Sequence, residues 1–280
     1  MSVSAHRTPA ASGSPADAEP LGRAGIVAEF HDVSVRFSSK KRDVLALRNV
    51  GLEVEHGEFV SIVGPSGCGK STLLKLLAGL LLPTDGRVVL RRQRVVGPRS
   101  DIGYVFQRAA LLEWRTARGN ILLQAEMRRM DSARAARRAD ELIEMVGLAG
   151  FQDALPHELS GGMQQRVALC RALLHNPSVL LMDEPFGALD ALTREQMNVE
   201  LHRVWKQTGT TVLLVTHSIA EAVYLSNRVA VMTARPGTVA AEITVHLPAE
   251  RDYAATMTQP QFTAAAGRIR ELLGAESHAE

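Results

Sequence analysis

The stretch Phe59-Val60-Ser61-Ile62-Val63-Gly64-Pro65-Ser66-Gly67-Cys68-Gly69-Lys70-Ser71-Thr72 decides the fold of this chain. A short apolar run, typical of a buried strand, ends directly in a glycine-rich loop, and the helix-forming segment Ser71–Leu80 follows. The loop Gly64–Thr72 matches GxxxxGK[ST], a pattern that requires a strand before it and a helix after it. Its glycines let backbone N–H groups surround phosphate oxygens, Lys70 neutralises phosphate charge, and Ser71 offers a hydroxyl to Mg²⁺. We therefore predict a phosphate-binding loop; a glycine-rich turn with an exposed lysine is the weaker interpretation.

Strand-like and helical patterns alternate along most of the chain. Apolar or alternating runs predict strands at Val27–Phe37, Val44–Glu55, Arg87–Leu90, Val179–Met182, Thr211–Val215 and Arg228–Thr233. Helices are predicted at Thr193–Thr208 and Ile219–Ser226, and Ser38–Asp43 reads as a polar turn. Because strands that alternate with helices usually form parallel sheets, we predict an α/β fold. The expected architecture is a P-loop NTPase core with a parallel sheet and an antiparallel β lead-in.

A helical, charge-rich segment interrupts this alternation at about residues 113–160 and predicts an inserted helical subdomain. One helix begins at Asp131 or Ser132 and ends at Gly147. Its apolar face comprises Ala135, Ala139, Leu142, Ile143 and Val146. We expect three parts of the chain: a disordered extension at 1–24, a nucleotide-binding domain at 25–249, and a helical tail at 250–280 with a helix near Phe262–Leu273.

Composition limits the classes of function. A formal charge of +2 in 280 residues is too small to indicate nucleic acid or an anionic membrane. Cys68 and Cys170 form no CxxC pattern, which fits a reduced compartment and gives no support for a zinc site. Without an apolar run of 18 residues, any membrane role is expected to come through a partner. The basic run Arg128, Arg129, Arg134, Arg137 and Arg138 predicts a solvated helix face, since no aromatic side chains interleave with it.

A second anion site is predicted at Leu159-Ser160-Gly161-Gly162-Met163-Gln164-Gln165-Arg166. Ser160, Gly161 and Gly162 open onto a helix, where bare backbone N–H groups and the helix dipole attract an oxyanion. This site has neither a lysine nor an obvious Mg²⁺ ligand. One complete and one incomplete phosphate site indicate a protein that pairs with a copy of itself, or with a homologue, to complete its chemistry.

Polar residues that suit phosphoryl transfer follow three of the predicted strands. Asp183 and Glu184 end the buried run Val179–Met182, where one carboxylate can hold Mg²⁺ through water and the other can polarise an attacking water. His217 follows the strand Thr211–Val215, and Gln107 follows Ile102–Phe106. Each residue also has an ordinary structural interpretation. Asp183 and Glu184 could be a capping acid pair, His217 a turn or capping residue, and Gln107 a surface amide. Parallel strands bring their carboxyl ends to one edge, so we predict that the four side chains meet there.

The ordered set of motifs resembles the nucleotide-binding subunit of an ATP-binding cassette (ABC) transporter over roughly Val27 to Val245. The set comprises Gly64–Thr72, Gln107, Leu159–Arg166, Val179–Glu184, Ala188-Leu189-Asp190 and His217. The resemblance implies an ATPase that uses ATP and Mg²⁺. A soluble cassette ATPase of translation or DNA repair is the alternative, but such proteins usually carry tandem cassettes or a zinc or coiled-coil insertion. A generic P-loop kinase leaves Ser160–Gly162 unexplained.

The resemblance also implies a role for each matching residue. Phe37 resembles the aromatic residue that stacks on adenine, although an ordinary core aromatic is the alternative. Gly64, Pro65, Ser66, Gly67, Cys68, Gly69, Lys70, Ser71 and Thr72 match the loop that binds the phosphates, with Ser71, Gln107 and Asp183 at the metal. Glu184 matches the general base, His217 the γ-phosphate switch, and Gln107 the residue that senses Mg²⁺ or water. Ser160, Gly161 and Gly162 would contact the γ-phosphate bound by the opposite protomer, and Asp190 resembles a loop aspartate that crosses between protomers.

Within this family, Phe106–Thr116 and Thr233-Ala234-Arg235-Pro236-Gly237 resemble the ATPases of nitrate, sulfonate and taurine importers. Glu113 stands where that class commonly has proline, and Ala117–Asn120 is atypical. The resemblance implies a homodimer beneath two membrane permease subunits, at the cytoplasmic face of the inner membrane. A binding protein outside the cell would deliver the solute, and no nucleic acid is expected. Cys68 lies near the helix N-terminus, which predicts a lowered thiol pKa.

Overall fold

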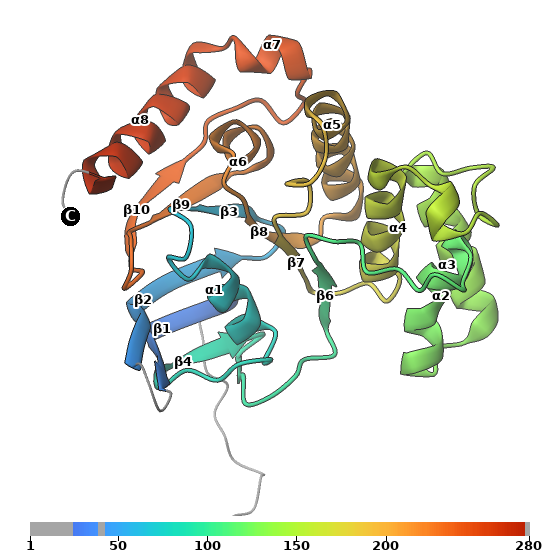
Figure 1. Cartoon of the computed structure of the whole chain (residues 1–280), viewed down its shortest axis with the longest axis horizontal. Coiled ribbons are helices and arrows are strands. Elements are labelled where there is room, and N and C mark those ends of the chain that lie inside the picture. Colours follow the sequence, from blue (N-terminus) through green and yellow to red (C-terminus); the bar gives the residue numbers. More distant parts are fainter. Residues whose placement is uncertain (1–24, 39–42, 278–280) are drawn as a thin grey trace, which may run out of the picture.

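The strands of the computed structural model form two sheets within residues 25–38 and 43–277, which the structure describes. Figure 1 shows the two sheets on the left and a group of helices on the right. The predicted extension 1–24 and the centre of the predicted turn Ser38–Asp43 lie outside the described residues. None of the helices in the described ranges is both long and apolar enough to cross a membrane.

The larger sheet is largely parallel and carries the phosphate loop. Its order is β10-β9-β3-β8-β7-β6, and only the pairing of β10 with β9 is antiparallel. The strands are β10 (Val239–Thr244), β9 (Arg228–Met232), β3 (Phe59–Val63), β8 (Thr211–Val215), β7 (Val179–Asp183) and β6 (Ile102–Val105). β3 and β8 are buried along their whole length, as continuous runs of apolar residues covered on both faces require.

The smaller sheet is the predicted antiparallel lead-in. Its order is β2 (Asp43–Glu55), β1 (Ile26–Ser38), β4 (Asp85–Leu90) and β5 (Gln93–Arg94). Helix α1 (Lys70–Leu77) packs between this sheet and the parallel sheet, and its four leucines are fully buried there. The helix was predicted to extend to Leu80 but ends at Leu77. Gly79 takes a left-handed φ of 71°, and a side chain there would collide with the carbonyl of Gly97.

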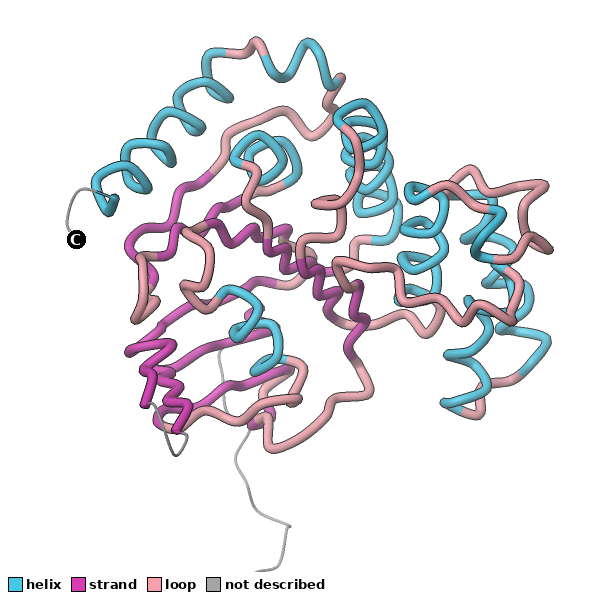
Figure 2. Tube along the Cα trace, viewed as in Figure 1, coloured by secondary structure: helices cyan, strands magenta, loops and turns pink. Residues whose placement is uncertain are grey.

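Helices α2 (Ala117–Arg128), α3 (Ser132–Met145) and α4 (Gly161–Leu173) lie beside the β6 edge of the sheet, and we call them the helical arm. Figure 2 shows this arm in cyan, apart from the magenta strands. Asp131 caps α3 by accepting a hydrogen bond from the backbone N–H of Arg134. The predicted apolar face of α3 is buried, and the chain leaves the helix before Gly147, whose φ is 65°.

The remaining helices cover the other face of the parallel sheet. They are α5 (Ala191–Thr208), α6 (Ile219–Leu225), α7 (Tyr253–Met257) and α8 (Pro260–Ser277). The helix predicted near Phe262–Leu273 is α8, which packs on α6 and β9. The prediction missed β10, because the sequence of Val239–Thr244 carries small residues and its apolar alternation is weak.

Candidate nucleotide site

The phosphate loop joins β3 to α1 in the conformation that the sequence predicts. Gly69 is the N-cap of α1 with a φ of 104°, and a Cβ there would lie 2.5 Å from the Leu47 side chain, so only glycine fits. Lys70 is 6% exposed, and its ammonium donates to the carbonyls of Gly64 (2.9 Å) and Pro65 (3.0 Å). This geometry places a positive charge beside the free N–H groups of the first turn of α1, which suits a phosphate.

A hydroxyl and a carboxylate meet where β7 ends beside α1. The Ser71 hydroxyl donates to one carboxylate oxygen of Asp183 at 2.8 Å, and the Tyr104 hydroxyl contacts the other at 3.5 Å. Burial and the Asp183 charge raise the pKa of Tyr104, so its phenol stays protonated and can donate. Hydroxyl and carboxylate oxygens are ligands that Mg²⁺ prefers, so this pair fits the predicted metal.

Glu184 lies beside His217, as the convergence of strand ends predicts. A carboxylate oxygen of Glu184 lies 3.3 Å from Nδ1 of His217. Glu184 has a left-handed φ of 45°, and its backbone N–H donates to the carbonyl of Val215 at 2.9 Å. Nε2 of Gln107 and Cε1 of His217 flank Gly187, each 3.6 Å from where a Cβ on that glycine would lie. The structure therefore brings Gln107, Glu184 and His217 to one edge of the sheet.

A cavity of about 430 Å³ lies over the phosphate loop. Among the predicted residues, its lining includes Phe37, Ser66, Gly67, Gly69, Lys70, Ser71, Thr72 and Glu184. Phe37 is 47% exposed, so it is available to a ligand and is not a core aromatic. Gly64, Pro65 and Cys68 frame the loop without lining the cavity. The expectation for Cys68 was wrong: burial raises the pKa of its thiol despite the neighbouring Lys70.

Ser160, Gly161 and Gly162 lie outside the lining of this cavity. Ser160 is the N-cap of α4, and its hydroxyl accepts from the backbone N–H of Met163 at 3.3 Å. A Cβ on Gly162 would lie 2.8 Å from the methyl group of Thr193, so Thr193 would have to shift to admit a side chain there. Asp190 caps α5 in the same way, and its hydrogen bonds with Thr193 lower the pKa of its carboxyl. The N-terminus of α4 at Ser160–Gly162 is thus separate from the cavity over the phosphate loop of its own chain.

The structure adds Arg235, which the sequence analysis did not place in the site. Its guanidinium lines the cavity and donates to the carbonyl of Gly67 from Nε (3.2 Å) and Nη2 (2.9 Å). Gly237, in the same β9–β10 loop, packs so closely that a Cβ would lie 1.9 Å from the carbonyl oxygen of Cys68. From the sequence, Thr233–Gly237 resembles a motif of the nitrate, sulfonate and taurine importer ATPases. That motif did not indicate that Arg235 contacts the phosphate loop.

Replacing Arg235 with alanine is expected to weaken ATP binding about three- to tenfold, because two charged hydrogen bonds that hold the loop at Gly67 are lost. Equilibrium binding of a fluorescent ATP analogue measures this change. Arg235→Lys keeps the charge but loses the forked donor, so it is expected to fall between the wild type and Arg235→Ala. Equal affinity of all three proteins would contradict the role given to Arg235.

Comparisons with known proteins support the same conclusion. The family model described as ABC transporter matches residues 47–187. The chain belongs to the ABC transporter family. The matched region holds the phosphate loop, Ser160–Gly162 and both carboxylates, so the chain is the ATP-hydrolysing subunit of a transporter.

Curated relatives cover most of the chain. The taurine import ATP-binding protein TauB of Roseobacter denitrificans is 46% identical over 211 residues, which are 75% of this chain and 79% of that protein. The nitrate import ATP-binding protein NrtD of Synechocystis sp. is 42% identical over 250 residues, which are 88% of this chain and 94% of that protein. An uncharacterized ABC transporter ATP-binding protein of Methanocaldococcus jannaschii, MJ0412, is 49% identical over 209 residues, which are 75% of this chain and 78% of that protein.

Solved structures have the same fold. The dimeric cassette MJ0796, bound to ADP and phosphate in a post-hydrolysis state, is 34% identical with a TM-score of 0.68. That comparison covers 79% of this chain and 100% of MJ0796. The cbiO1 protein of Clostridium perfringens reaches a TM-score of 0.71 over 91% of this chain at 22% identity, which supports the fold alone.

Proposed function

We propose that this chain energises an importer for a small solute such as a sulfonate, taurine or nitrate. The proposal rests on the identity to TauB and NrtD and on the matching segments Phe106–Thr116 and Thr233–Gly237. The chain would act as a homodimer beneath two permease subunits, at the cytoplasmic face of the membrane. The domain limits 25–249 and 250–280, with the helical subdomain at 113–160, remain part of this proposal.

The observation that carries the mechanism is the meeting of Ser71, Asp183 and Glu184 beside Lys70. Bound Mg²⁺ would neutralise charge on the β- and γ-phosphates, with Ser71 and Asp183 holding it and Gln107 close to it. Lys70 and the first turn of α1 would bind the phosphates, and Phe37 would cover the adenine. Glu184 would accept a proton from the attacking water, and His217 would contact the γ-phosphate.

The site of one chain would be completed by its partner. Ser160, Gly161 and Gly162 present a helix N-terminus without a lysine, and they do not line their own chain's cavity. In a dimer they would contact the γ-phosphate held by the partner's phosphate loop. The MJ0796 cassette bound to ADP and phosphate is a dimer, which supports the pairing of two chains.

The surface proposed to contact the permease is the segment Gln107–Asn120. Just before and within it, Phe106 and Trp114 are 46% and 76% exposed, which is unusual for large apolar side chains. Glu113, in the place of the usual proline, is exposed in the same segment. The replacement of proline by Glu113 would therefore alter the surface that contacts the permease and leave the phosphate site unchanged.

Reconstitution with its permease and binding protein in liposomes tests the proposed transport function. ATP hydrolysis is expected to rise several-fold with one of taurine, an alkanesulfonate or nitrate, because solute delivery favours closure of the dimer. Lys70→Ala in the same complex is expected to abolish the response. Hydrolysis that responds to none of these solutes would contradict the proposed solute class.

A further inference from the structure

A large cavity lies away from the nucleotide site, at the opposite ends of the strands. It has a volume of about 760 Å³ and lies between α3 on one side and the α5–β8 turn, Thr208–Thr211, on the other. The α4–β7 loop, which contains His175, forms its floor, and a second cavity of about 620 Å³ adjoins it through that loop. This size falls in the range of pockets that hold small organic ligands.

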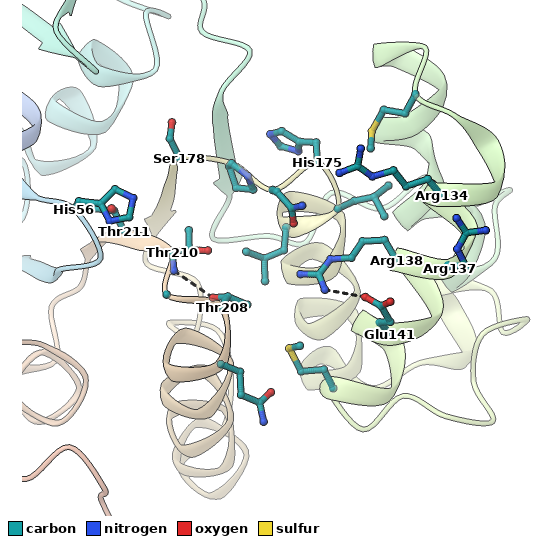
Figure 3. Close-up of a pocket in the computed structure, with 18 residues that line it drawn as sticks. His56, Arg134, Arg137, Arg138, Glu141, His175, Ser178, Thr208, Thr210 and Thr211 are labelled. Carbon is teal, nitrogen blue, oxygen red and sulfur yellow. Dashed lines mark hydrogen bonds and ion pairs between the residues drawn. The ribbon is translucent and has the colours of Figure 1, made fainter.

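The walls of the pocket are positively charged. Arg134 and Arg138 extend from α3 across the pocket in Figure 3, whereas Arg137 turns away from it. The adjoining cavity adds Arg91 and Arg128. Among these arginines, Arg138 pairs with Glu141 (3.0 Å) and Arg91 lies 4.0 Å from Asp101. The Arg134 guanidinium has no ion pair with any described residue, so its charge is left for a ligand to neutralise.

Two polar atoms of pocket residues are shielded from solvent and have no hydrogen-bond partner among the described residues. They are Nε of Arg138 and Nδ1 of His175. Nε2 of His175 lies 3.2 Å from the carbonyl of Ile102, which requires that Nε2 carries the proton and leaves Nδ1 as an acceptor. Burial, together with the nearby Arg128, lowers the pKa of His175 to about 4, so the ring is neutral at pH 7. Because both atoms are closed to water, a ligand in the open cavity does not reach them, and the charge of the pocket comes from its arginines.

We propose that this pocket binds a small organic phosphate, such as a sugar phosphate. Guanidinium groups match phosphate oxygens in geometry and charge, so Arg134 and Arg138 would hold the phosphate. Met130 and Met145, which also line the pocket, offer apolar contact to the carbon skeleton.

The pocket and the nucleotide site lie at opposite ends of the same secondary-structure elements. The pocket lies at the carboxyl end of α4 and at the amino ends of β7 and β8. The opposite ends of the same elements carry Ser160–Gly162, Asp183 and, just beyond β8, His217. Helix α4 has 13 residues, a length of about 20 Å. A ligand would also bridge α3 of the helical arm to the α5–β8 turn of the core, so it is placed to regulate hydrolysis without entering the nucleotide site.

Calorimetric titration of the full chain with fructose 1,6-bisphosphate, used as the probe, tests this proposal. The wild type is expected to bind the probe, and Arg134→Gln/Arg138→Gln is expected to bind it at least about tenfold more weakly, since two charged contacts are lost. Arg270→Gln, which removes an exposed arginine of α8 far from the pocket, is the matched control and is expected to bind like the wild type. Thermal melting of each variant without the probe shows that it is folded.

Further titrations locate the bound probe. Saturation of the phosphate loop with ADP is expected to leave binding unchanged, and inorganic phosphate is expected to bind at least about tenfold more weakly than the sugar phosphate. The proposal is overturned if ADP displaces the probe, if Arg270→Gln weakens binding as much as the double variant, or if inorganic phosphate binds equally well. It is also overturned if the probe does not bind at about 10 mM, where even a weak specific site would be filled.

Discussion

Replacing Glu184 with glutamine is expected to lower steady-state ATP hydrolysis about a hundredfold or more, while ATP binding persists. The amide keeps the size of the side chain and can still contact His217, but it cannot accept a proton from water. The phosphate loop, Ser71 and Asp183 are untouched, so nucleotide affinity is expected to stay within about twofold of the wild type. ATP-bound dimers should therefore accumulate, which size-exclusion chromatography with ATP and Mg²⁺ can detect.

The control for this variant is Glu144→Gln, which makes the same chemical change on the exposed face of α3. It is expected to hydrolyse ATP at the wild-type rate. A Glu184→Gln protein with unchanged hydrolysis would exclude Glu184 as the general base. Loss of ATP binding together with hydrolysis would instead indicate that the carboxylate holds the nucleotide or its metal.

Replacing Ser160 with arginine is expected to abolish hydrolysis to a similar extent while leaving ATP binding to the isolated monomer unchanged. Ser160 lies at the N-terminus of α4 and outside the cavity of its own chain, so the added side chain does not obstruct that cavity. In a dimer, the arginine would occupy the space of the partner's γ-phosphate and keep the two chains apart. Comparison of ATP affinity in dilute protein with turnover in concentrated protein measures both effects.

Loss of the helix cap is the competing explanation for a Ser160→Arg defect, since the Ser160 hydroxyl accepts from Met163. Ser160→Gly removes the same hydroxyl without adding bulk, and the cap loss costs only a few tenths of a kcal/mol at a glycine. It is expected to retain more activity than Ser160→Arg. Equal loss in the two variants would assign the defect to the cap or to the hydroxyl.

The positions of site residues that follow a buried strand, each within a short motif, could be predicted from the sequence. The order of Lys70, Ser71, Asp183 and Glu184 along strand–loop–helix patterns is local, and the rule that parallel strands share a carboxyl edge brings them together. The same rule placed Gln107 and His217 beside Glu184. In each case the sequence near the residue carried the information.

Contacts between distant loops could not be predicted in this way. Arg235 reaches Gly67 across 168 positions of sequence, and nothing in the periodicity of either segment indicates that they meet. The basic run was predicted to be a solvated helix face, and Arg134 is exposed as predicted. Helical spacing shows which residues share a face but not which segment lies opposite. The α5–β8 turn, about seventy residues later, converts that face into the wall of a pocket.

The central claim is that each hydrolysis site is shared between two chains, and a heterodimer of Lys70→Ala and Ser160→Arg chains tests it most directly. Each homodimer is expected to be inactive. In the purified heterodimer, one site combines both lesions, whereas the other combines the intact phosphate loop of the Ser160→Arg chain with the intact Ser160–Gly162 of its partner. We predict that ATP hydrolysis rises at least about tenfold above either homodimer, because one complete site is restored. If each site lay within a single chain, both sites of the heterodimer would carry one lesion, and hydrolysis as low as in the homodimers would contradict the account.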